Sequence, residues 1–401
     1  MDFTPIAPTN TRGEIDRVLL EKAEKLLVES AKLTGSHTPQ ILQAVKDLLY
    51  TVNSYYSNKI ESEGTHIVDI ERAMRHEYAS DSKEKKLQLL SLAHIEVQKE
   101  IEHHFKEEEG ASPFSKELIL SVHKSFYSKE GMEDFLQLSH GDLKETLIPG
   151  VLRSRLVKVG QHTAPDAAIL DTLMNTFDHL YGKTAKARDA ARLVYMMASH
   201  HRLMWIHPFL DGNGRTARLV LDGAFVSMGM QGYGLWNLSR GLARNSDTYK
   251  RLLAHADMPQ QGQYDGRGAL SSRALGEFVD FMLDTALDQI EYMNKNLKLD
   301  VLTKRLDRYV LRVNDGLMDM DPLPKHTDKL FRHLLLVGEC TRGAVVDVAG
   351  VKERTGSRMI AELIKRGYLE SDSRVAPIRL KIGASMASYL FPSLVPEAPN
   401  S

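Results

Sequence analysis

Residues 207–218 read HPFLDGNGRTAR, and the fold prediction is built outward from this segment. The stretch before it, 189–206, is mostly apolar in its second half and has helical periodicity, so we expect a buried central helix. That helix would deliver His207 to the edge of a cavity, because the proline after it opposes continuation of the helix. Gly212 and Gly214 can adopt the positive φ of a tight turn. The segment is therefore predicted to join two helices by a tight loop.

The composition of this loop predicts a binding site for phosphate groups. A Gly-Asn-Gly turn points successive backbone N–H groups into a concave nest, and the next helix begins there with its positive dipole end. Arg215 and Arg218 are three residues apart and therefore lie on one face of that helix. Each residue alone is more simply explained by capping or packing, but that explanation does not account for the whole string. We therefore expect a polyphosphate ligand.

Two further side chains of the loop suggest a reaction. Asp211 beside a phosphate nest fits a Mg²⁺ ion shared with nucleotide phosphates, because Mg²⁺ prefers carboxylate and phosphate oxygens. His207 lies across the loop, where a nearby helix N-terminus disfavours the imidazolium form and leaves a neutral base. The predicted chemistry is attack by a hydroxyl group on a nucleotide phosphate, stabilised by N–H groups, Mg²⁺ and arginines.

The whole string resembles the Fic-domain signature, HxFx(D/E)GNGRxxR, at every fixed position. This resemblance implies an all-α core and transfer of AMP from ATP to a Ser, Thr or Tyr hydroxyl of a protein. It also implies a role for each residue of the loop. His207 would be the base and Asp211 the Mg²⁺ ligand. The phosphate nest would be formed by Gly212, Asn213 and Gly214, and the β- and γ-phosphates would be bound by Arg215 and Arg218. Doc-type toxins of the family have lysine at the second glycine and act as kinases, so Gly214 favours AMP transfer.

Two other segments match parts of the Fic layout. Residues 148–165, IPGVLRSRLVKVGQHTAP, have the pattern of a small hairpin, and the family's hairpin, called the flap, pairs edge-on with an extended segment of the target. A purely structural hairpin is the alternative. Residues 239–257 fall where the family closes over the nucleotide base, and Tyr249 is the candidate contact there. A buried aromatic side chain is the alternative for Tyr249.

A second motif lies near the N-terminus, where residues 57–62 read SNKIES. Fic proteins with an inhibitory helix carry (S/T)xxxE(G/N); Ser57 and Glu61 match it, whereas Ser62 stands where Gly or Asn is usual. The resemblance implies that Glu61 pairs with Arg218 and prevents productive placement of the γ-phosphate. Carboxylate and phosphate compete for the same guanidinium donors, and a charge-assisted hydrogen bond contributes about 1.5–3 kcal/mol, or about one to two decades in binding. The alternative is a solvated acid near a helix end.

The composition is typical of a globular protein. The 401 residues carry a formal net charge of −1, with 42% hydrophobic and 26% charged residues, so no overall field draws the chain to nucleic acid or to an anionic membrane. The single cysteine, Cys340, cannot form an intrachain disulfide, and no signal-peptide pattern is present. No apolar stretch is long enough to span a membrane. We therefore expect a cytoplasmic protein.

The chain divides into an N-terminal helical region, a catalytic core and a C-terminal module. An acidic run followed by Gly and Pro at 106–113, and two prolines at 320–325, mark the boundaries. The predicted ranges are 1–110 with the inhibitory helix at 38–62, 111–315 for the Fic core, 316–325 for a linker, 326–384 for a winged helix-turn-helix domain and 385–401 for a tail. Other helices are predicted at 14–33, 81–107, 165–181, 184–206, 213–229, 238–255 and 270–313.

The sequence of the C-terminal module does not identify its ligand. Residues 341–371 have the lengths of helix, turn and helix. Basic side chains decorate the second helix and the following wing: Arg354, Arg358, Lys365, Arg366, Arg374, Arg379 and Lys381. Such a face could contact DNA phosphates, but winged helices also bind proteins or pack within their own chain.

The sequence therefore predicts a protein adenylyltransferase that uses ATP and Mg²⁺ and is inhibited by Glu61. Its expected partners are an unidentified protein substrate and the protein itself, because the flap could hold a segment of a neighbouring copy in a homodimer. Two alternatives remain. One is a de-AMPylase in which Glu61 activates water, and the other is a DNA-binding regulator whose Fic core senses nucleotide.

Overall fold

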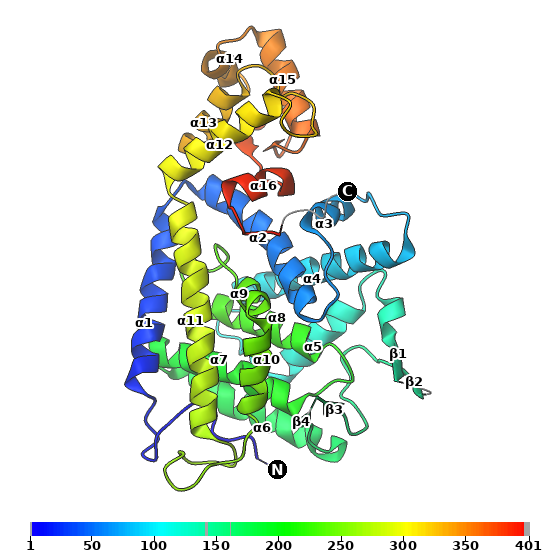
Figure 1. The fold of residues 1–401 in the computed structure, drawn as a ribbon, viewed down its shortest axis with the longest axis vertical. Coiled ribbons are helices and arrows are strands. Elements are labelled where there is room, and N and C mark those ends of the chain that lie inside the picture. Colours follow the sequence, from blue (N-terminus) through cyan, green and yellow to red (C-terminus); the bar gives the residue numbers. More distant parts are fainter. Residues whose placement is uncertain (1, 141–142, 161, 397–401) are drawn as a thin grey trace.

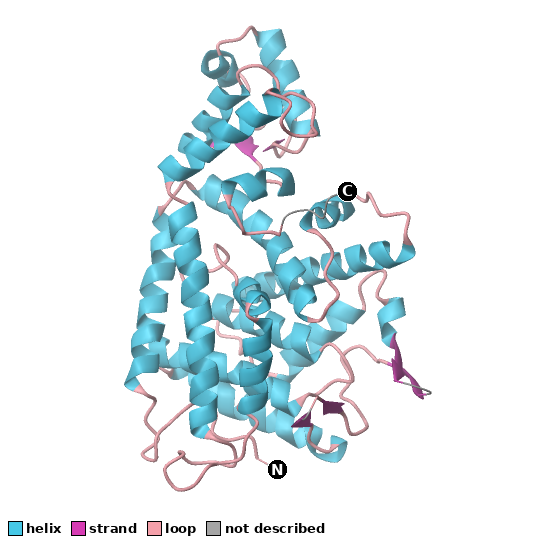
Figure 2. Ribbon diagram, viewed as in Figure 1, coloured by secondary structure: helices cyan, strands magenta, loops and turns pink. Residues whose placement is uncertain are grey.

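The computed structural model describes residues 2–140, 143–160 and 162–396, and these residues are mainly helical (Figure 2). The α-helices are α1 Arg17–Lys32, α2 Pro39–Ile60, α3 Ile67–Met74, α4 Ser82–Glu107, α5 Lys116–Tyr127, α6 Leu170–Gly182, α7 Asp189–Ile206, α8 Asn213–Ser227, α9 Leu238–Arg244, α10 Ser246–His255, α11 Ser272–Asn296, α12 Leu299–Asn314, α13 Thr327–Val337, α14 Ala344–Ala349, α15 Glu353–Lys365 and α16 Ala384–Leu390. The strands are β1 Gln137–His140, β2 Leu143–Thr146, β3 Lys158–Val159, β4 His162–Thr163, β5 Glu339–Cys340, β6 Leu369–Glu370 and β7 Ile378–Leu380. The predicted helical fold class is confirmed. Within the described ranges, no helix has both the length and the apolar character needed to cross a bilayer.

The centre of the helical core is formed by α7 and α8, the helices on either side of the 207–218 loop (Figure 1). Helix α8 is buried continuously from Asn213 to Phe225, and α7 packs against α1, α6, α8 and α11. Burial of each large apolar side chain in such a core contributes about 1.5–3 kcal/mol. The prediction of a buried central helix at 189–206 is confirmed, since α7 ends at Ile206 with most of its second half enclosed.

Helix α2, which carries the second motif, closely matches its predicted range. Pro39 occupies the first helical position and Thr38 the N-cap position, although the Thr38 side chain makes no capping hydrogen bond. The helix packs against α3, α4, α8 and α9. Its side chains are buried continuously from Thr51 to Asn58, and five of these eight residues are Ser, Thr or Asn. A polar stretch of α2 is therefore enclosed by protein, and its hydrogen bonds tie it to α8.

The β-structure before α6 differs from the single hairpin predicted at 148–165. Strands β3 and β4 form a two-residue ladder inside that range, whereas residues 148–157 contain no strand. An additional hairpin precedes them, in which β1 and β2 pair from Gln137 with Thr146. The described side chains of β1 and β2 are not fully buried, so these strands lack the alternating apolar pattern that would predict them.

The long helix predicted at 270–313 is two helices, α11 and α12. Helix α11 ends at Asn296, Leu297 enters the core, and α12 begins two residues later. Neither Gly nor Pro marks the break. The Leu297 carbonyl instead accepts a hydrogen bond from the imidazole of His37, which is 260 residues away in the sequence. Helical periodicity alone does not reveal this break, because the apolar pattern continues through it.

The C-terminal module lies at one end of the long axis of the molecule (Figure 1). It contains α13, α14 and α15, and its three strands form an antiparallel sheet in the order β5-β7-β6. The tail predicted at 385–401 begins inside α16, which packs against α3 and α12 and buries Met386 and Leu390. The described part of that segment, through 396, is therefore folded onto the helical core, while 397–401 lie outside the described residues.

Candidate active site

His207 ends α7 and lies at the start of the loop. Its backbone is left-handed, with φ 49° and ψ 63°, and its N–H donates to the Leu203 carbonyl at 3.0 Å. Only 8% of its surface is exposed. Burial, with smaller contributions from Arg153 and His162, lowers the pKa of His207 to about 4. The imidazole is therefore neutral at pH 7, as expected, but burial rather than a helix N-terminus is the main cause.

Arg153 fixes the predicted flap against the loop. Its Nε donates to the His207 carbonyl at 2.8 Å, and its backbone N–H donates to the Pro208 carbonyl at 2.9 Å. Its two terminal nitrogens donate to the Arg155 and Pro165 carbonyls, each at 2.6 Å. Arg153 was not predicted as a site residue. Its only signal in the sequence is its position inside the flap segment, because its partners are backbone carbonyls that carry no residue-type signature.

Asp211 lies in the loop beside an aromatic side chain of α5. Its Oδ2 accepts from the Tyr127 hydroxyl at 3.0 Å and from Nη2 of Arg215 at 3.3 Å. Its Oδ1 makes no hydrogen bond within the described part of the chain, and the side chain is partly exposed. An open carboxylate oxygen beside an anion site fits Mg²⁺, which keeps several waters and binds phosphate oxygens. Since the described residues contain no cluster of three His, Cys, Asp or Glu side chains suited to a metal, water and nucleotide would supply the other ligands.

The glycine and asparagine residues of the loop shape its turn. Gly212 has φ 77° and lies against the Tyr127 ring, so a Cβ at this position would overlap the ring. Asn213 accepts the Phe209 N–H on Oδ1 at 2.9 Å and donates from Nδ2 to the Phe209 carbonyl at 2.8 Å. Helix α8 starts at Asn213, and the N–H groups of its first turn have no intrahelical acceptor. The turn therefore presents an anion site, and the Asn213 side chain holds its shape.

The two arginines of the loop are buried, with 4% of the Arg215 side chain and 3% of the Arg218 side chain exposed. Nη1 of Arg215 donates to Oε2 of Glu63 at 2.6 Å. Arg218 donates from Nε to Ser57 Oγ at 2.9 Å and from Nη2 to Glu61 Oε1 at 2.7 Å. The expected contact between Glu61 and Arg218 is present, and a second carboxylate, not predicted, engages the other arginine.

Helices α2 and α8 run antiparallel with a regular register. Three contacts define this register: Asn53 with Asp222, Ser57 with Arg218, and Glu61 with Gly214. From one contact to the next, the residue number rises by four in α2 and falls by four in α8. A Cβ at position 214 would overlap Oε1 of Glu61, so glycine at this position lets the carboxylate reach the arginine. The four-residue spacing of Ser57 and Glu61 therefore equals the spacing of their partners, Arg218 and Gly214, across one helix–helix interface.

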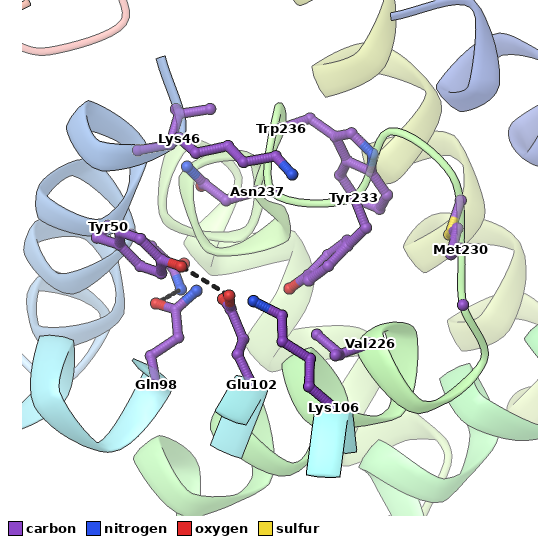
Figure 3. A pocket seen from close by; sticks show the side chains of 14 residues that line it. Lys46, Tyr50, Gln98, Glu102, Lys106, Val226, Met230, Tyr233, Trp236 and Asn237 are labelled. Atoms are coloured by element: carbon purple, nitrogen blue, oxygen red, sulfur yellow. Dashed lines mark hydrogen bonds between the residues drawn. The ribbon is translucent and has the colours of Figure 1, made fainter. Parts of the chain in front are cut away.

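The same interface opens into a cavity of about 160 Å³ between α2, α4 and the segment after α8 (Figure 3). Tyr50 donates to Glu102 at 2.6 Å on one side of the cavity, and the lysines Lys46 and Lys106 extend over it. Asp222, next to the cavity, accepts from Asn53, and burial raises the pKa of Asp222 to about 6. None of the predicted site residues lines this cavity. It is therefore separate from the loop that is the candidate active site.

The chain leaves α2 through a left-handed turn at Ser62, where φ is 64°. The Ser62 N–H donates to the Lys59 carbonyl at 2.9 Å, and the Glu63 N–H donates to the Asn58 carbonyl at 3.0 Å. These two bonds form the Schellman arrangement that usually has glycine or asparagine at the left-handed position. A residue with a Cβ adopts this conformation at a cost of about 1–2 kcal/mol. Serine at position 62, where the motif usually has Gly or Asn, therefore keeps the same backbone turn.

Tyr249 is enclosed in the core. Only 2% of its surface is exposed, and its hydroxyl shares a hydrogen bond of 2.7 Å with Nε2 of His200. Its ring also lies near Phe278 of α11. The charges of Arg218 and Glu61 act on its hydroxyl, so Tyr249 lies beside the candidate site. Its burial matches the alternative of a buried aromatic side chain, and its contact with a nucleotide base stays a prediction.

Comparison with known proteins is consistent with this fold and loop. Residues 113–223 match the Fic/DOC family. The protein adenylyltransferase Fic of Drosophila grimshawi is 35% identical over 80 residues, covering 20% of this chain and 16% of that protein. The protein of the same name from Nematostella vectensis is 38% identical over 81 residues, covering 20% of this chain and 18% of that protein. The chain thus matches less than a fifth of the length of these curated relatives.

A solved structure extends the likeness in fold beyond the matched segment. A Fic domain containing signaling protein from Bacteroides thetaiotaomicron superposes with a TM-score of 0.53 and 18% identity, over 69% of this chain and 97% of that chain. The likeness in fold therefore covers most of the chain, whereas the family match covers residues 113–223. Within this chain, residues 113–223 form the domain of the Fic/DOC family.

Proposed function

We propose that this protein transfers AMP from ATP, with Mg²⁺, to the hydroxyl of a Ser, Thr or Tyr side chain of a protein, including its own. The observation that carries the proposal is the turn between α7 and α8. This turn combines a buried neutral imidazole, the free N–H groups of a helix N-terminus and two buried arginines. The names of the adenylyltransferase relatives support the same reaction.

In the proposed reaction, His207 removes the proton of the acceptor hydroxyl as its oxygen attacks the α-phosphorus of ATP. A new bond forms between that oxygen and the α-phosphorus, the bond from the α-phosphorus to the bridging oxygen breaks, and pyrophosphate leaves. Arg215 and Arg218 bind the β- and γ-phosphates and stabilise the charge of the leaving group, because guanidinium groups match phosphate oxygens in geometry. Bound at Asp211, Mg²⁺ would neutralise phosphate charge.

The flap segment offers a docking place for the acceptor. Ile148, Val151, Leu156 and Val159 are exposed apolar residues of this segment. An extended chain laid along it would cover these side chains and approach His207, because Arg153 ties the segment to the His207 carbonyl. A segment of a second copy would fit the same place, which accounts for the proposed self-modification in a homodimer.

We also propose that the protein is inhibited by its own α2. Glu61 and the Ser57 carbonyl take the two N–H groups of Nη2 of Arg218, and the Ser57 hydroxyl takes Nε, so among the described hydrogen bonds only Nη1 is left for a γ-phosphate. The charge of Arg218 and nearby Arg215 lowers the pKa of the Glu61 carboxyl despite its burial, so this acid is ionised at neutral pH. An ionised acid at this position competes directly with phosphate.

Labelled ATP tests the reaction type. We expect label from the α-phosphate to become covalently attached to protein, and label from the γ-phosphate to remain in solution, because AMP carries only the α-phosphorus. Each label is supplied to the protein in separate reactions with and without Mg²⁺, and protein-bound label and intact mass are measured. Attachment of γ-label instead would indicate phosphoryl transfer and contradict the proposal.

The alternative within the enzyme class is removal of AMP from a modified protein. In that case Glu61 would activate water, and one of its oxygens remains available for this, since the described hydrogen bonds of Glu61 to side chains involve Oε1 alone. The two directions differ in the effect of removing this acid. AMP transfer would rise, whereas release of AMP from a modified protein would fall.

We propose that residues 327–380 form a winged helix, since helix, strand, two helices and two strands follow one another in the order of that motif. Arg379 pairs with Asp372, whereas Arg354, Arg358 and Lys365 are exposed on α15 and make no ion pair with described residues. Duplex DNA is the candidate ligand of this face. We expect the affinity of the protein for duplex DNA, measured by fluorescence anisotropy, to fall steeply as the salt concentration rises. The affinity should also be lower in the Arg354→Ala/Arg358→Ala variant. Lack of DNA binding at low salt would assign the module to protein contacts or internal packing.

A further inference from the structure

Glu63 holds Arg215 much as Glu61 holds Arg218. Oε2 of Glu63 accepts from Nη1 of Arg215 at 2.6 Å, and Oε1 of Glu61 accepts from Nη2 of Arg218 at 2.7 Å. Both arginines are almost fully buried, whereas 36% of the Glu63 side chain and 35% of the Glu61 side chain are exposed. Each pair therefore joins a fixed cation in the core to an acid on the loop after α2, and the acid is the partner that can move away.

We infer that Glu63 is a second inhibitory residue, which withholds Arg215 from the β-phosphate of the nucleotide. The inference rests on the proposed function, because it assigns Arg215 to that phosphate. Glu63 is a positioning residue, since it touches the arginine rather than the reacting atoms.

The remaining partners of Arg215 explain why Glu63 matters. Nη2 donates to the Tyr127 hydroxyl at 3.1 Å and to Asp211 at 3.3 Å, and Nε has no partner among the described residues. Tyr127 is buried on α5 and Asp211 belongs to the same loop as the arginine, so both would stay beside it when nucleotide binds. Glu63 is the partner that comes from the turn after α2, and its side chain is 36% exposed. Its departure would free the shortest of these contacts for phosphate.

The turn at Ser62 places the two acids for this task. Glu61 ends α2, Ser62 reverses the chain through its left-handed conformation, and Glu63 follows, held by the bond from its N–H to the Asn58 carbonyl at 3.0 Å. Glu61 and Glu63, two residues apart across this turn, thereby contact Arg218 and Arg215, which are three residues apart in the first two turns of α8. One short loop carries both contacts, so a shift of that loop would release both arginines together.

Nucleotides with different numbers of phosphates separate the two contacts. In Glu63→Ala we expect the affinity for ADP and for ATP to rise by about tenfold or more, the effect of removing one competing charge-assisted hydrogen bond. The affinity for AMP should stay unchanged, because AMP has no β-phosphate. In Glu61→Ala we expect the affinity for ATP to rise while that for ADP changes little. Calorimetric titration with AMP, ADP and ATP in the presence of Mg²⁺ measures all of these.

Matched variants distinguish this role from a purely structural one. Glu63→Gln keeps the size of the side chain and removes its charge, so it should shift ADP affinity in the same direction. Glu291→Ala removes an exposed ion pair with Lys295 and should leave every affinity unchanged. A structural loss alone would change the affinities for AMP and ADP in parallel, whereas the inferred role changes ADP alone.

Three results would decide the matter. A selective rise in ADP affinity in both Glu63 variants supports the inference. Unchanged ADP affinity in those variants, together with increased ATP affinity in Glu61→Ala, overturns the inference and leaves the proposed function intact. Absence of nucleotide binding in all variants, including Glu61→Ala/Glu63→Ala, overturns the proposed function and the inference with it.

Discussion

Replacing His207 by alanine is expected to slow AMP transfer by about 10²–10⁴-fold, the usual contribution of a positioned general base. The buried imidazole is neutral, and the His207 carbonyl is bonded to Arg153 of the flap segment, along which the acceptor would lie. The other histidine at this turn, His123, is occupied: its ring stacks on Phe209, its Nε2 lies 3.2 Å from the Asp211 carbonyl, and its Nδ1 accepts from the Gly150 N–H. Transfer of α-labelled AMP is best followed in the Glu61→Gly background, where the starting rate is expected to be highest.

A matched variant separates the loss of the base from a change in the loop. His207 has φ 49°, a left-handed conformation that asparagine tolerates better than alanine. His207→Asn should therefore keep the turn and still lose transfer, while ATP affinity stays near that of the parent protein. A normal transfer rate in both variants would exclude His207 as the base. Lost ATP binding in both would instead indicate that the loop has changed shape.

The pH dependence of the same reaction follows from the pKa of about 4 for His207. The base is active when deprotonated, so kcat/KM should be level from about pH 5.5 to 8 and should fall only at lower pH. An unperturbed imidazole would make the rate climb through about pH 6.5. Folding stability must be measured in parallel, because the pKa of His94 and of His200 is held at about 3 by burial. Such residues stay neutral in the folded state, so stability is lost as pH falls below about 6.5, where the unfolded chain takes up protons.

The parts of the site that the sequence could predict are those whose determinants are contiguous. The loop follows from a proline, two glycines and two arginines within twelve residues, and α7 follows from its apolar second half. The spacing between Ser57 and Glu61 equals one helical turn, and the structure shows the same step between Arg218 and Gly214. Local rules of turns, caps and helical faces were sufficient for all of these.

The parts that could not be predicted depend on partners far apart in the sequence. Three hydrogen-bonded pairs show this. The sequence separation is 54 residues between Arg153 and His207, 84 between Tyr127 and Asp211, and 152 between Glu63 and Arg215. Neither periodicity nor motif spacing encodes such distances. A signal for Glu63 nevertheless existed, since an acid two residues beyond the Glu61 motif, past a turn, could reach the neighbouring arginine. At the break between α11 and α12, the Leu297 carbonyl is likewise bonded to a distant residue, His37.

Replacing Glu61 by glycine is expected to raise AMP transfer by about 10- to 100-fold, most plainly onto the protein itself. The variant removes the charge-assisted hydrogen bond to Arg218, worth about 1.5–3 kcal/mol, and leaves the guanidinium free for the γ-phosphate. The helix end should persist, because position 61 has φ −89° and the turn is made by the backbone at Ser62.

Glu61→Gln is the matched variant, since it keeps the side-chain volume beside Gly214 and loses the charge. Competition for the guanidinium predicts that glutamine releases most of the inhibition, whereas steric exclusion predicts that it releases none, because the amide fills the same space. The rate of incorporation of α-labelled AMP and the intact mass of the product are measured for both variants. Rates equal to that of the parent protein in both would show that Glu61 does not inhibit the reaction. A gain in glycine alone would show that the side chain blocks the nucleotide by its bulk.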